Sequence, residues 1–356
     1  MQLRTAFYAC MLLAVPCSNS YSEMPWCRPS LVYYGWDIKD TSYLRHHWRE
    51  IDATAPFDGM GIKVAISPAA WASGNNSTAN QLGWKLFGKQ KFSIEQFFAQ
   101  IGDLQSTAFT NVTDNLLPVI LSSGYNEGLG WFDDNRWNTV LANLDVLAQI
   151  MAATGIKNIV MDPEHYNYRM FSYTTQSAAR PASREDYYWQ VRAIGQRVAY
   201  TIQYRVGPFN ILSLYGYTLA AKSSEYDLLP AFFDGILDVL ARQPGSTFTD
   251  GYESAYGYKK FDQFAKAVDD IYGAEKISGN PDAYATILKV GFGLWVDYQG
   301  NTAYFTPQEF GMAAFYAKLL ASRFVWIYSQ RMGMLQDDSV NAPYLQALRQ
   351  LQRRCQ

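Results

Sequence analysis

The sequence is poor in charged residues and in histidine, and each shortage excludes a class of function. Charged side chains make up 17% of the 356 residues, below the roughly 25% usual for soluble domains, and the net charge is −2. No basic cluster stands out, so nucleic acid is not an expected partner. The only histidines are His46, His47 and His165, too few for a zinc site built from several histidines on different strands.

Other signatures are absent as well. No G-x-S-x-G stretch marks a serine nucleophile, and no glycine-rich phosphate loop follows the first predicted strand. No apolar run reaches the ~18 residues that a membrane-spanning helix needs. The sequence therefore predicts a monomer with no cofactor, no bound metal and no membrane span.

The first 22 residues resemble an export signal rather than folded structure. Arg4 precedes the apolar run "AFYACMLLAV" (6–15), and small residues follow at Ser20 and Ser22. A basic region, a short apolar region and small residues, in this order, are typical of a secretory signal peptide. We therefore expect cleavage near Ser22.

The mature chain, residues 23–356, is expected to form one domain and to be secreted or periplasmic. Lipidation at Cys17 is disfavoured because Pro16 precedes it. The mature chain keeps Cys27 near its start and Cys355 near its end. In an oxidising compartment an even pair favours a disulfide between them, and the alternative is two unpaired buried thiols.

Eight apolar segments of strand length alternate with helical patterns, which indicates parallel strands buried on both faces. A single (β/α)8 barrel explains their number, and an open doubly wound sheet is the alternative. The barrel also places the first strand beside the last, so that Cys27 and Cys355 could meet at its N-terminal face. The predicted strands are 31–38, 59–66, 115–122, 156–164, 209–216, 246–253, 287–297 and 323–330.

The helices between these strands have recognisable ends. Thr306 and Pro307 suit the N-cap and first position of a helix, and Gly155 and Gly207 stand where helices should stop. Residues 67–92 are expected to form a long loop on the catalytic face. The predicted amphipathic helices are 93–109, 136–155, 183–207 and 306–322.

The stretch "IVMDPEHYNY" (159–168) ends a buried strand in two carboxylates. Asp162 and Glu164 are two residues apart, so their side chains point to the same side. Pointing inward avoids the desolvation cost of wedging two charges between strand and helix. Adjacent carboxyls also shift each other's pKa, as acid/base catalysis near neutral pH requires. Structural ion pairs with Arg or Lys are the alternative.

Polar and aromatic side chains follow the other predicted strands, where a barrel keeps its working residues. Aromatic residues make up 16% of the chain, and rings that stack on sugars are one use for them; a large core is the other. The residues that we expect to bind substrate are Trp36, Asp37, His165, Tyr215, Asp250, Tyr252, Trp295, Trp326 and Tyr328.

The Asp-x-Glu sequence closing the fourth strand, with an aromatic residue two positions later, resembles the end of the signature of chitinase-type glycoside hydrolases. In those (β/α)8 enzymes the Glu is the general acid and the Asp orients the substrate's acetamido group, which implies these roles for Glu164 and Asp162. The resemblance also implies that Tyr252 and Trp326 complete the site. The full pattern is Asp-Gly-x-Asp-x-Asp-x-Glu, and its first three defined positions are here Lys157, Asn158 and Val160.

The broader resemblance is to secreted (β/α)8 glycoside hydrolases, and it implies two catalytic carboxyls. Glu253 is the expected partner of Glu164, with Asp250 and Asp37 as competitors. We therefore expect hydrolysis of an oligo- or polysaccharide. Two alternatives remain: a non-catalytic glycan-binding barrel, and a hydrolase whose metal is held by Asp162, Glu164 and Asp297.

Overall fold

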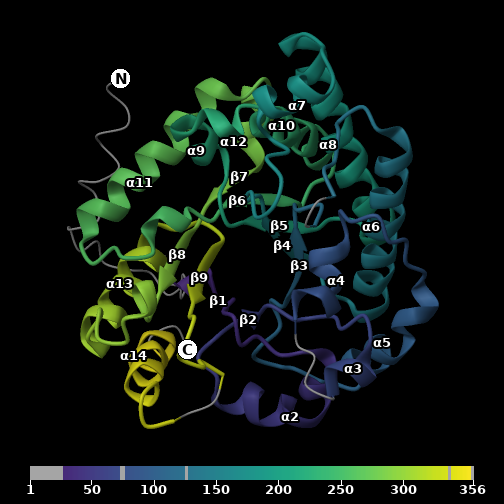
Figure 1. Cartoon of the computed structure of the whole chain (residues 1–356). Helices are drawn as coiled ribbons and strands as arrows, with labels where there is room; N and C mark the ends of the chain where they lie inside the picture. The colour runs from purple at the N-terminus through teal and green to yellow at the C-terminus, as the bar shows by residue number, and fades with distance from the viewer. Residues whose placement is uncertain (1–26, 73–76, 125–126, 336–337, 354–356) are drawn as a thin grey trace.

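The computed structural model describes residues 27–72, 77–124, 127–335 and 338–353, and its strands surround a common centre (Figure 1). In chain order the strands are β1 (Ser30–Tyr33), β2 (Gly59–Met60), β3 (Leu116–Ile120), β4 (Asn158–Asp162), β5 (Asn210–Ser213), β6 (Thr247–Asp250), β7 (Leu288–Val290), β8 (Phe292–Trp295) and β9 (Phe324–Tyr328).

All strand pairings are parallel, and they form two sheets that join at both sides. One sheet has the order β2-β1-β9-β8 and the other β3-β4-β5-β6-β7. Gly61 pairs with Leu116 between β2 and β3, and β7 continues into β8 through Gly291. The strands therefore close into a ring of the (β/α)8 type. Each of the eight predicted segments contains a strand, and the seventh is divided in two.

The division at Gly291 has a steric cause. A Cβ atom built on Gly291 would lie 2.6 Å from Thr249 Cγ2 and 2.9 Å from the Phe324 carbonyl oxygen, so no larger residue fits. The Gly291 amide still donates to the Asp250 carbonyl at 2.9 Å, which keeps β6 in contact through the break. The ring can thus change strand partners here without opening.

The pairing between β2 and β3 is the sparsest part of the ring, and Pro118 explains part of this. The Leu121 amide donates toward β4, to the Asp162 carbonyl. Because donors alternate along a strand, position 118 faces β2, and proline has no N–H to donate there. The loop after β2 runs past this gap, and Gly83 packs against Pro118.

A layer of apolar side chains fills the interior of the ring, with members from five strands. On β4, Val160 belongs to this layer, whereas Ile159 and Met161 belong to the larger core between strands and helices. Strand alternation then directs Asp162 inward, above Val160, as expected. The interior residues are Val32, Leu116, Val160, Leu212, Leu214, Phe324 and Trp326.

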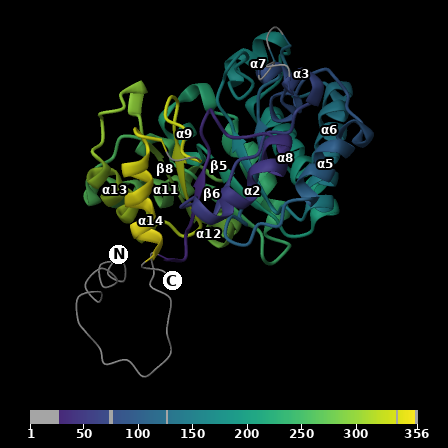
Figure 2. The same cartoon turned by 90° about the horizontal axis from the view of Figure 1, so that it is seen from below.

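Helices cover the outside of the ring (Figures 1 and 2). Their bounds are α2 (Thr41–Thr54), α3 (Pro68–Ala72), α4 (Leu82–Lys85), α5 (Phe98–Gln105), α6 (Asp134–Thr154), α7 (Tyr173–Ala179), α8 (Arg184–Val206), α9 (Tyr217–Lys222), α10 (Leu229–Leu240), α11 (Phe261–Gly273), α12 (Pro281–Ile287), α13 (Pro307–Leu320) and α14 (Ala342–Arg353). The four predicted helices are present as α5, α6, α8 and α13.

Local signals place several helix ends. Ser183 and Asp186 form a capping box at the start of α8, and Thr306 caps α13 with Glu309. Gly155 follows α6 with φ 76°. The predicted long loop 67–92 is only partly irregular, because it contains α3 and α4.

The described ends of the chain lie together. The Asp58 carboxylate accepts hydrogen bonds from the Leu31 amide at 2.7 Å and from Gln352 Nε2 at 3.0 Å, so β1 begins beside the last turn of α14. Cys27 takes part in a disulfide. Cys355 lies outside the described residues, so its pairing with Cys27 stays a prediction.

The predicted signal peptide, residues 1–22, also lies outside the described residues. Within the part of the chain that the structure describes, none of the helices combines the length and the hydropathy needed to cross a membrane.

Candidate active site

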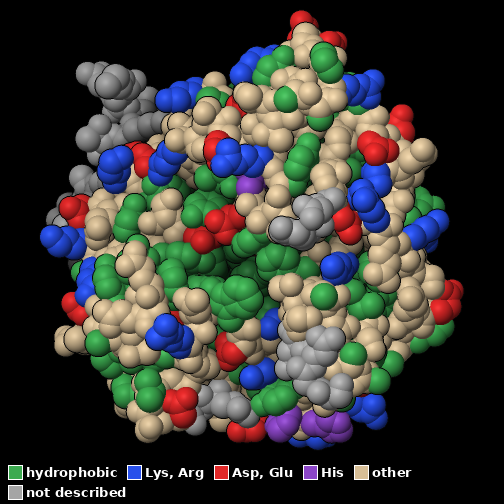
Figure 3. Space-filling model, in the orientation of Figure 1, with side chains coloured by type: hydrophobic (Ala, Val, Ile, Leu, Met, Phe, Trp, Pro, Cys, Tyr) green, Lys and Arg blue, Asp and Glu red, His purple; other side chains and the backbone are tan. Residues whose placement is uncertain are grey.

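A cleft opens at the carboxyl ends of the strands, and Figure 3 shows a hollow in this face with acidic and hydrophobic side chains around it. The cleft encloses about 780 Å³, its open mouth included. Its lining joins residues on or just after β1, β3, β4, β5, β6, β8 and β9 with residues that follow β2. The lining residues are Tyr34, Gly35, Trp36, Ile38, Lys63, Gln81, Trp84, Pro118, Asp162, Glu164, Tyr166, Leu214, Glu253, Tyr256, Trp295 and Tyr328.

The end of β4 supplies two of the three carboxyl groups in the cleft. Asp162 Oδ1 accepts a hydrogen bond from the Glu164 amide at 3.0 Å, which fixes the turn that carries both groups. The Tyr166 hydroxyl lies 2.6 Å from Asp162 Oδ2 and 2.9 Å from Glu164 Oε2. This hydroxyl has one proton, so it can donate to only one of the two carboxyls at a time.

The third carboxyl, Glu253, follows β6 at the start of a short 3-10 turn (Glu253–Ala255). Its amide donates to the Leu214 carbonyl at 3.0 Å, and the preceding residue, Tyr252, has the unusual φ of 40°. A left-handed conformation at a tyrosine is strained, and here it turns Glu253 back over the ring. Glu253 Oε2 is buried and has no hydrogen-bond partner among the described residues.

Burial raises the pKa of all three carboxyls, and the charge of a neighbouring carboxyl adds to the shift at Asp162 and Glu253. Burial, and then the charge of Glu164, raise the pKa of Asp162 to about 7. Burial, followed by the charges of Glu164 and Asp162, raises the pKa of Glu253 to about 9. Burial also raises the pKa of Glu164, against the hydrogen bond from Tyr166. No lysine or arginine among the described residues offsets these shifts, so the cluster holds protons at neutral pH.

Aromatic rings form most of the walls. Trp84 packs against Tyr166 with 4.8 Å between ring centroids, and Tyr256 stacks on Tyr328 at 5.4 Å. Trp295 meets Tyr328 edge to face at 5.2 Å. Trp36 keeps 53% of its surface exposed. Such rings present apolar faces beside polar groups, which suits a ligand that has both C–H faces and hydroxyls.

Six of the sequence-predicted residues line this cleft together: Asp162, Glu164, Glu253, Trp36, Trp295 and Tyr328. Tyr215 does not line the cleft, but it lies close enough for the charges of Glu253 and Glu164 to act on it. Burial, and then these two charges, raise the pKa of Tyr215. Asp37 lines a neighbouring hollow instead.

Asp250 and Tyr252 are not cleft residues. Asp250 is fully buried and points outward from β6, where it accepts hydrogen bonds from the Gly216 amide and the Thr218 hydroxyl at 3.1 and 3.0 Å. The Tyr252 hydroxyl donates to Asp270 at 2.7 Å, on the outer side of the ring. Both residues lie in the segment that leads to Glu253, and neither lines the cleft in which they were expected to bind substrate.

His165 and Trp326 are also placed differently from the expectation. The His165 ring stacks on Tyr226, with 4.0 Å between centroids, and its Nε2 accepts from the Phe171 amide. Burial lowers the pKa of His165 to about 4, so the ring is neutral. Trp326 is fully buried inside the ring, with Nε1 donating to the Gly251 carbonyl at 2.8 Å. It forms a floor below the cleft rather than an exposed platform.

Asp297, the third ligand of the metal-dependent alternative, does not join the other two carboxyls. It is fully buried and accepts from Trp295 Nε1 at 2.8 Å and from the amides of Arg331 and Met332. Among the described residues no group of three or more His, Cys, Asp or Glu side chains is placed to hold a metal ion.

Several cleft residues escaped the sequence analysis. Tyr34 directly follows β1, and Tyr256 follows Glu253 by three residues, so their distance from a strand end was a usable signal. Trp84 and Gln81 reach the cleft from the loop after β2, in agreement with the expectation that this loop lies on the catalytic face.

No family model and no curated protein matches this chain. Among solved structures, the chain is similar at low sequence identity to enzymes with a (β/α)8 barrel. The chain is similar to a GH18 chitinase from Pseudoalteromonas aurantia (TM-score 0.45, 12% identity, covering 90% of this chain and 99% of that one). It is also similar to a D-psicose 3-epimerase from Clostridium cellulolyticum H10 (TM-score 0.45, 12% identity, covering 92% of this chain and 99% of that one). A third similar structure is a 3-keto-D-glucoside 4-epimerase from E. coli (TM-score 0.40, 13% identity, covering 92% of this chain and 100% of that one).

Proposed function

We propose that this protein is a glycoside hydrolase that uses carboxyl groups as acid and base. The observation that carries the proposal is the cluster of Asp162, Glu164 and Glu253, which meet in one aromatic-walled cleft without a cationic partner among the described residues. Burying three carboxyls without a partner destabilises a fold. Such an arrangement is typical of a site where proton transfer needs it.

Glycosidic bond cleavage needs one carboxyl that donates a proton to the leaving oxygen and a second that acts as base or nucleophile. Glu253 is proposed as the donor, because burial and the charges of Glu164 and Asp162 raise its pKa to about 9. Glu164 is proposed as its ionised partner, and Asp162 positions Glu164 through Tyr166. The reverse assignment of the two glutamates uses the same pair and the same cleft.

The aromatic walls support a carbohydrate as substrate. Trp36, Trp84 and Trp295 offer flat apolar faces, and Lys63 and Gln81 add polar groups between them. We also propose that the protein is a secreted or periplasmic single-domain barrel of residues 23–356. In this form the signal peptide has been removed and a Cys27–Cys355 disulfide joins the ends of the chain.

The decisive experiment is an assay of reducing-sugar release over a broad set of polysaccharides and oligosaccharides. Wild type is compared with Glu164→Gln, Glu253→Gln and the control Glu185→Gln, which changes an exposed glutamate on α8. We expect release by wild type and the control, and a loss of about 10²–10⁴-fold in either cleft variant. Both cleft variants should keep the thermal unfolding temperature of wild type or exceed it.

Other outcomes would point elsewhere. Binding of oligosaccharides without release by any variant would favour the non-catalytic glycan-binding barrel. Conversion of free sugars into isomers, detected by chromatography, would identify a sugar epimerase or isomerase and contradict hydrolysis. Activity that disappears with EDTA and returns with a divalent cation would favour the metal-dependent alternative.

A further inference from the structure

A second hollow adjoins the cleft. It encloses about 1080 Å³ with its open mouth included, and it is lined on its own side by Asp37, Lys39, Asp40 and Tyr43, with further residues of the loop after β2. Four residues line both spaces, so the two lie side by side. The shared residues are Trp36, Ile38, Lys63 and Gln81.

Trp36 forms the boundary between the cleft and the second hollow. Half of its side chain is exposed, and its carbonyl accepts a hydrogen bond from Lys63 Nζ at 2.7 Å. Lys63 is itself a lining residue of both spaces, and burial lowers its pKa to about 8. The position of the Trp36 backbone is therefore tied to a partly buried lysine that lines both spaces.

The charges that line the second hollow balance. Lys39 and Lys63 carry positive charge, and Asp37 and Asp40 carry negative charge. Asp37 accepts from the Tyr33 hydroxyl, and Asp40 accepts from the Tyr43 amide at 3.0 Å, so both carboxylates are already engaged. The cleft on the other side of Trp36 holds only carboxyls and one lysine among its charged groups.

Tyr43 gives the second hollow an aromatic wall of its own. It lies in the first turn of α2, where the His47 ring stacks on it with 4.1 Å between centroids and Lys39 Nζ lies 5.1 Å from its ring centroid. The second hollow thus combines a ring, hydrogen-bonding groups and no net charge. A hydroxyl-rich, uncharged ligand matches this combination, whereas an anionic ligand would meet the three carboxyls of the neighbouring cleft.

We propose that the second hollow binds additional units of an uncharged oligosaccharide chain that crosses Trp36 to reach the carboxyl cluster. This inference rests on the proposed function, because it makes the substrate a chain with units in both spaces. Sugar units in the second hollow would contact Tyr43 and Lys39, and the bond to be cleaved would lie on the other side of Trp36, near Glu164 and Glu253.

The test measures affinity against chain length by isothermal titration calorimetry. The probes are uncharged oligosaccharides of two to six units built from glucose, mannose, xylose and N-acetylglucosamine, with oligogalacturonates as the charged counterpart. The Glu164→Gln variant is used to prevent turnover. We expect at least one uncharged series to gain about fivefold to tenfold in affinity when the chain becomes long enough to pass Trp36.

Two further substitutions test whether the gain in affinity comes from the second hollow. Tyr43→Ala and Lys39→Ala, each in the Glu164→Gln background, should abolish the gain with length and leave the affinity for the shortest bound chain unchanged. Using both protects the test from a disturbed start of α2, because Lys39 precedes that helix. Tyr200→Ala is the matched control, since this exposed tyrosine lies on α8 and lines neither space.

Each outcome decides the inference separately from hydrolysis. An affinity that does not rise with length, or a rise that both variants keep, would overturn the second hollow as a glycan site even if wild type hydrolyses short substrates. A larger gain for oligogalacturonates would overturn the uncharged chain. A rise that both variants abolish supports the inference, even where wild type releases no reducing sugar and the proposed hydrolysis fails. No binding of any probe would overturn the second hollow as a glycan site, and reducing-sugar release by wild type would then decide hydrolysis by itself.

Discussion

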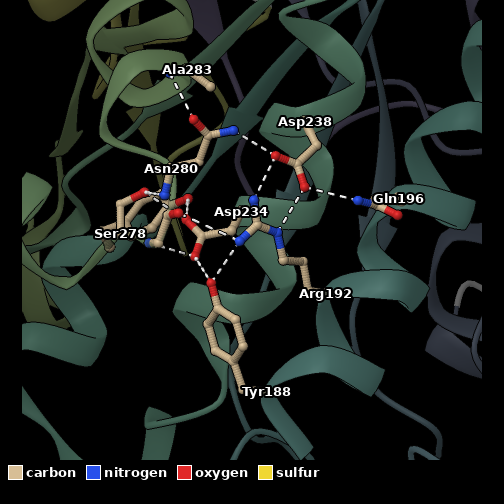
Figure 4. Close-up of polar contacts among 10 residues, drawn as sticks. Tyr188, Arg192, Gln196, Asp234, Asp238, Ser278, Asn280 and Ala283 are labelled. Atoms are coloured by element: carbon tan, nitrogen blue, oxygen red, sulfur yellow. Dashed lines mark hydrogen bonds and ion pairs between the residues drawn. The ribbon is translucent and has the colours of Figure 1, made fainter. Parts of the chain in front are cut away.

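Two clusters of buried acids in this molecule behave in opposite ways. In the cleft, Asp162, Glu164 and Glu253 have no cationic partner among the described residues, and their pKa values are raised. In the helical layer, Asp234 and Asp238 lie within the network of polar contacts shown in Figure 4. The same residue types therefore serve two purposes, and their hydrogen-bond partners decide which.

The helix-layer network satisfies its acids. Arg192 Nε and Nη2 donate to the Asp238 carboxylate at 2.8 and 2.9 Å, and Gln196 and Asn280 add further donors. Burial alone would raise the pKa of Asp238, but these hydrogen bonds outweigh it and hold the pKa below its usual range. The network links α8, α10 and the start of α12.

The contrast separates stability from chemistry. A buried carboxylate with several donors is stabilised in its charged form and resists any change of protonation. Buried carboxyls that face one another are destabilised in the charged form and exchange protons near neutral pH. A shifted carboxyl pKa therefore does not identify an active site by itself. A raised carboxyl pKa in an open cleft is the more specific sign.

The largest expected effect is on turnover. Glu253→Gln should lower the rate by about 10²–10⁴-fold, because the amide cannot donate a proton to a leaving oxygen. Steady-state rates with the best substrate from the polysaccharide set provide the measurement. Asp238→Asn serves as the comparison from the helical layer and should keep the rate per folded molecule. Equal rate losses in the two variants would remove the distinction between the clusters.

The next effect is on stability. Asp238→Ala should lower the free energy of unfolding by about 3 kcal/mol, because it leaves the largely buried Arg192 guanidinium without its carboxylate. Urea denaturation of the variant, beside Glu253→Gln, measures this difference. Glu253→Gln should be neutral or stabilising, since it removes an acid whose charged form is unfavourable. A destabilised Glu253→Gln beside an unaffected Asp238→Ala would reverse the comparison.

The pH dependence of stability should also differ between the clusters. Glu253 has a folded-state pKa of about 9, above its ordinary value of about 4.3, so the stability it contributes is complete below pH 4 and is lost as pH rises toward 9. Asp238 has a lowered pKa, so its contribution is lost as pH falls below the ordinary value of about 3.9.

Thermal unfolding temperatures measured from pH 3 to pH 9 test these signs. Glu253→Gln should gain stability over wild type at pH 8 more than at pH 5. Asp238→Asn should lose more at pH 7 than at pH 3. Parallel pH profiles for wild type and both variants would mean that neither group has a shifted pKa.

The smallest effect concerns Tyr166. Tyr166→Phe removes a hydrogen bond that lowers the pKa of Asp162 and of Glu164. We expect a rate loss of about tenfold or less and an acidic limb of the pH–rate profile that moves to higher pH. Tyr200→Phe, on the surface of α8, is the control. A rate loss with an unmoved limb would assign Tyr166 to substrate contact instead.

Much of the fold was predictable because parallel strands are apolar along their whole length. The segments around β3, β4 and β9 stood out for this reason, and each contains a buried strand. The helix α10 was not predicted, since all of its residues are buried and no polar face marks its period. The break at Gly291 was equally invisible, because it depends on contacts with two other strands.

The site was predictable in part for a similar reason. Strand alternation directed Asp162 and Glu164 to the same side, and position after a strand end selected Glu253. Strand alternation also predicted that Asp250 and Glu253 point to opposite sides, and Asp250 does point outward. The stacking of His165 on Tyr226, outside the cleft, depends on the packing of its own loop, which one sequence does not reveal.

The left-handed backbone of Tyr252 has a consequence for substitutions outside the cleft. Its side chain is held at the outside by Asp270 and Lys222, while its backbone delivers Glu253 to the cleft. Such a conformation costs about 1–3 kcal/mol, and the hydrogen bonds of Tyr252 with Asp270 and Lys222 offset this strain. A substitution of Asp270, on α11, would therefore loosen the turn that carries Glu253 without changing any residue of the cleft. Contacts on the outer helices of this barrel thus help to set the geometry of its centre.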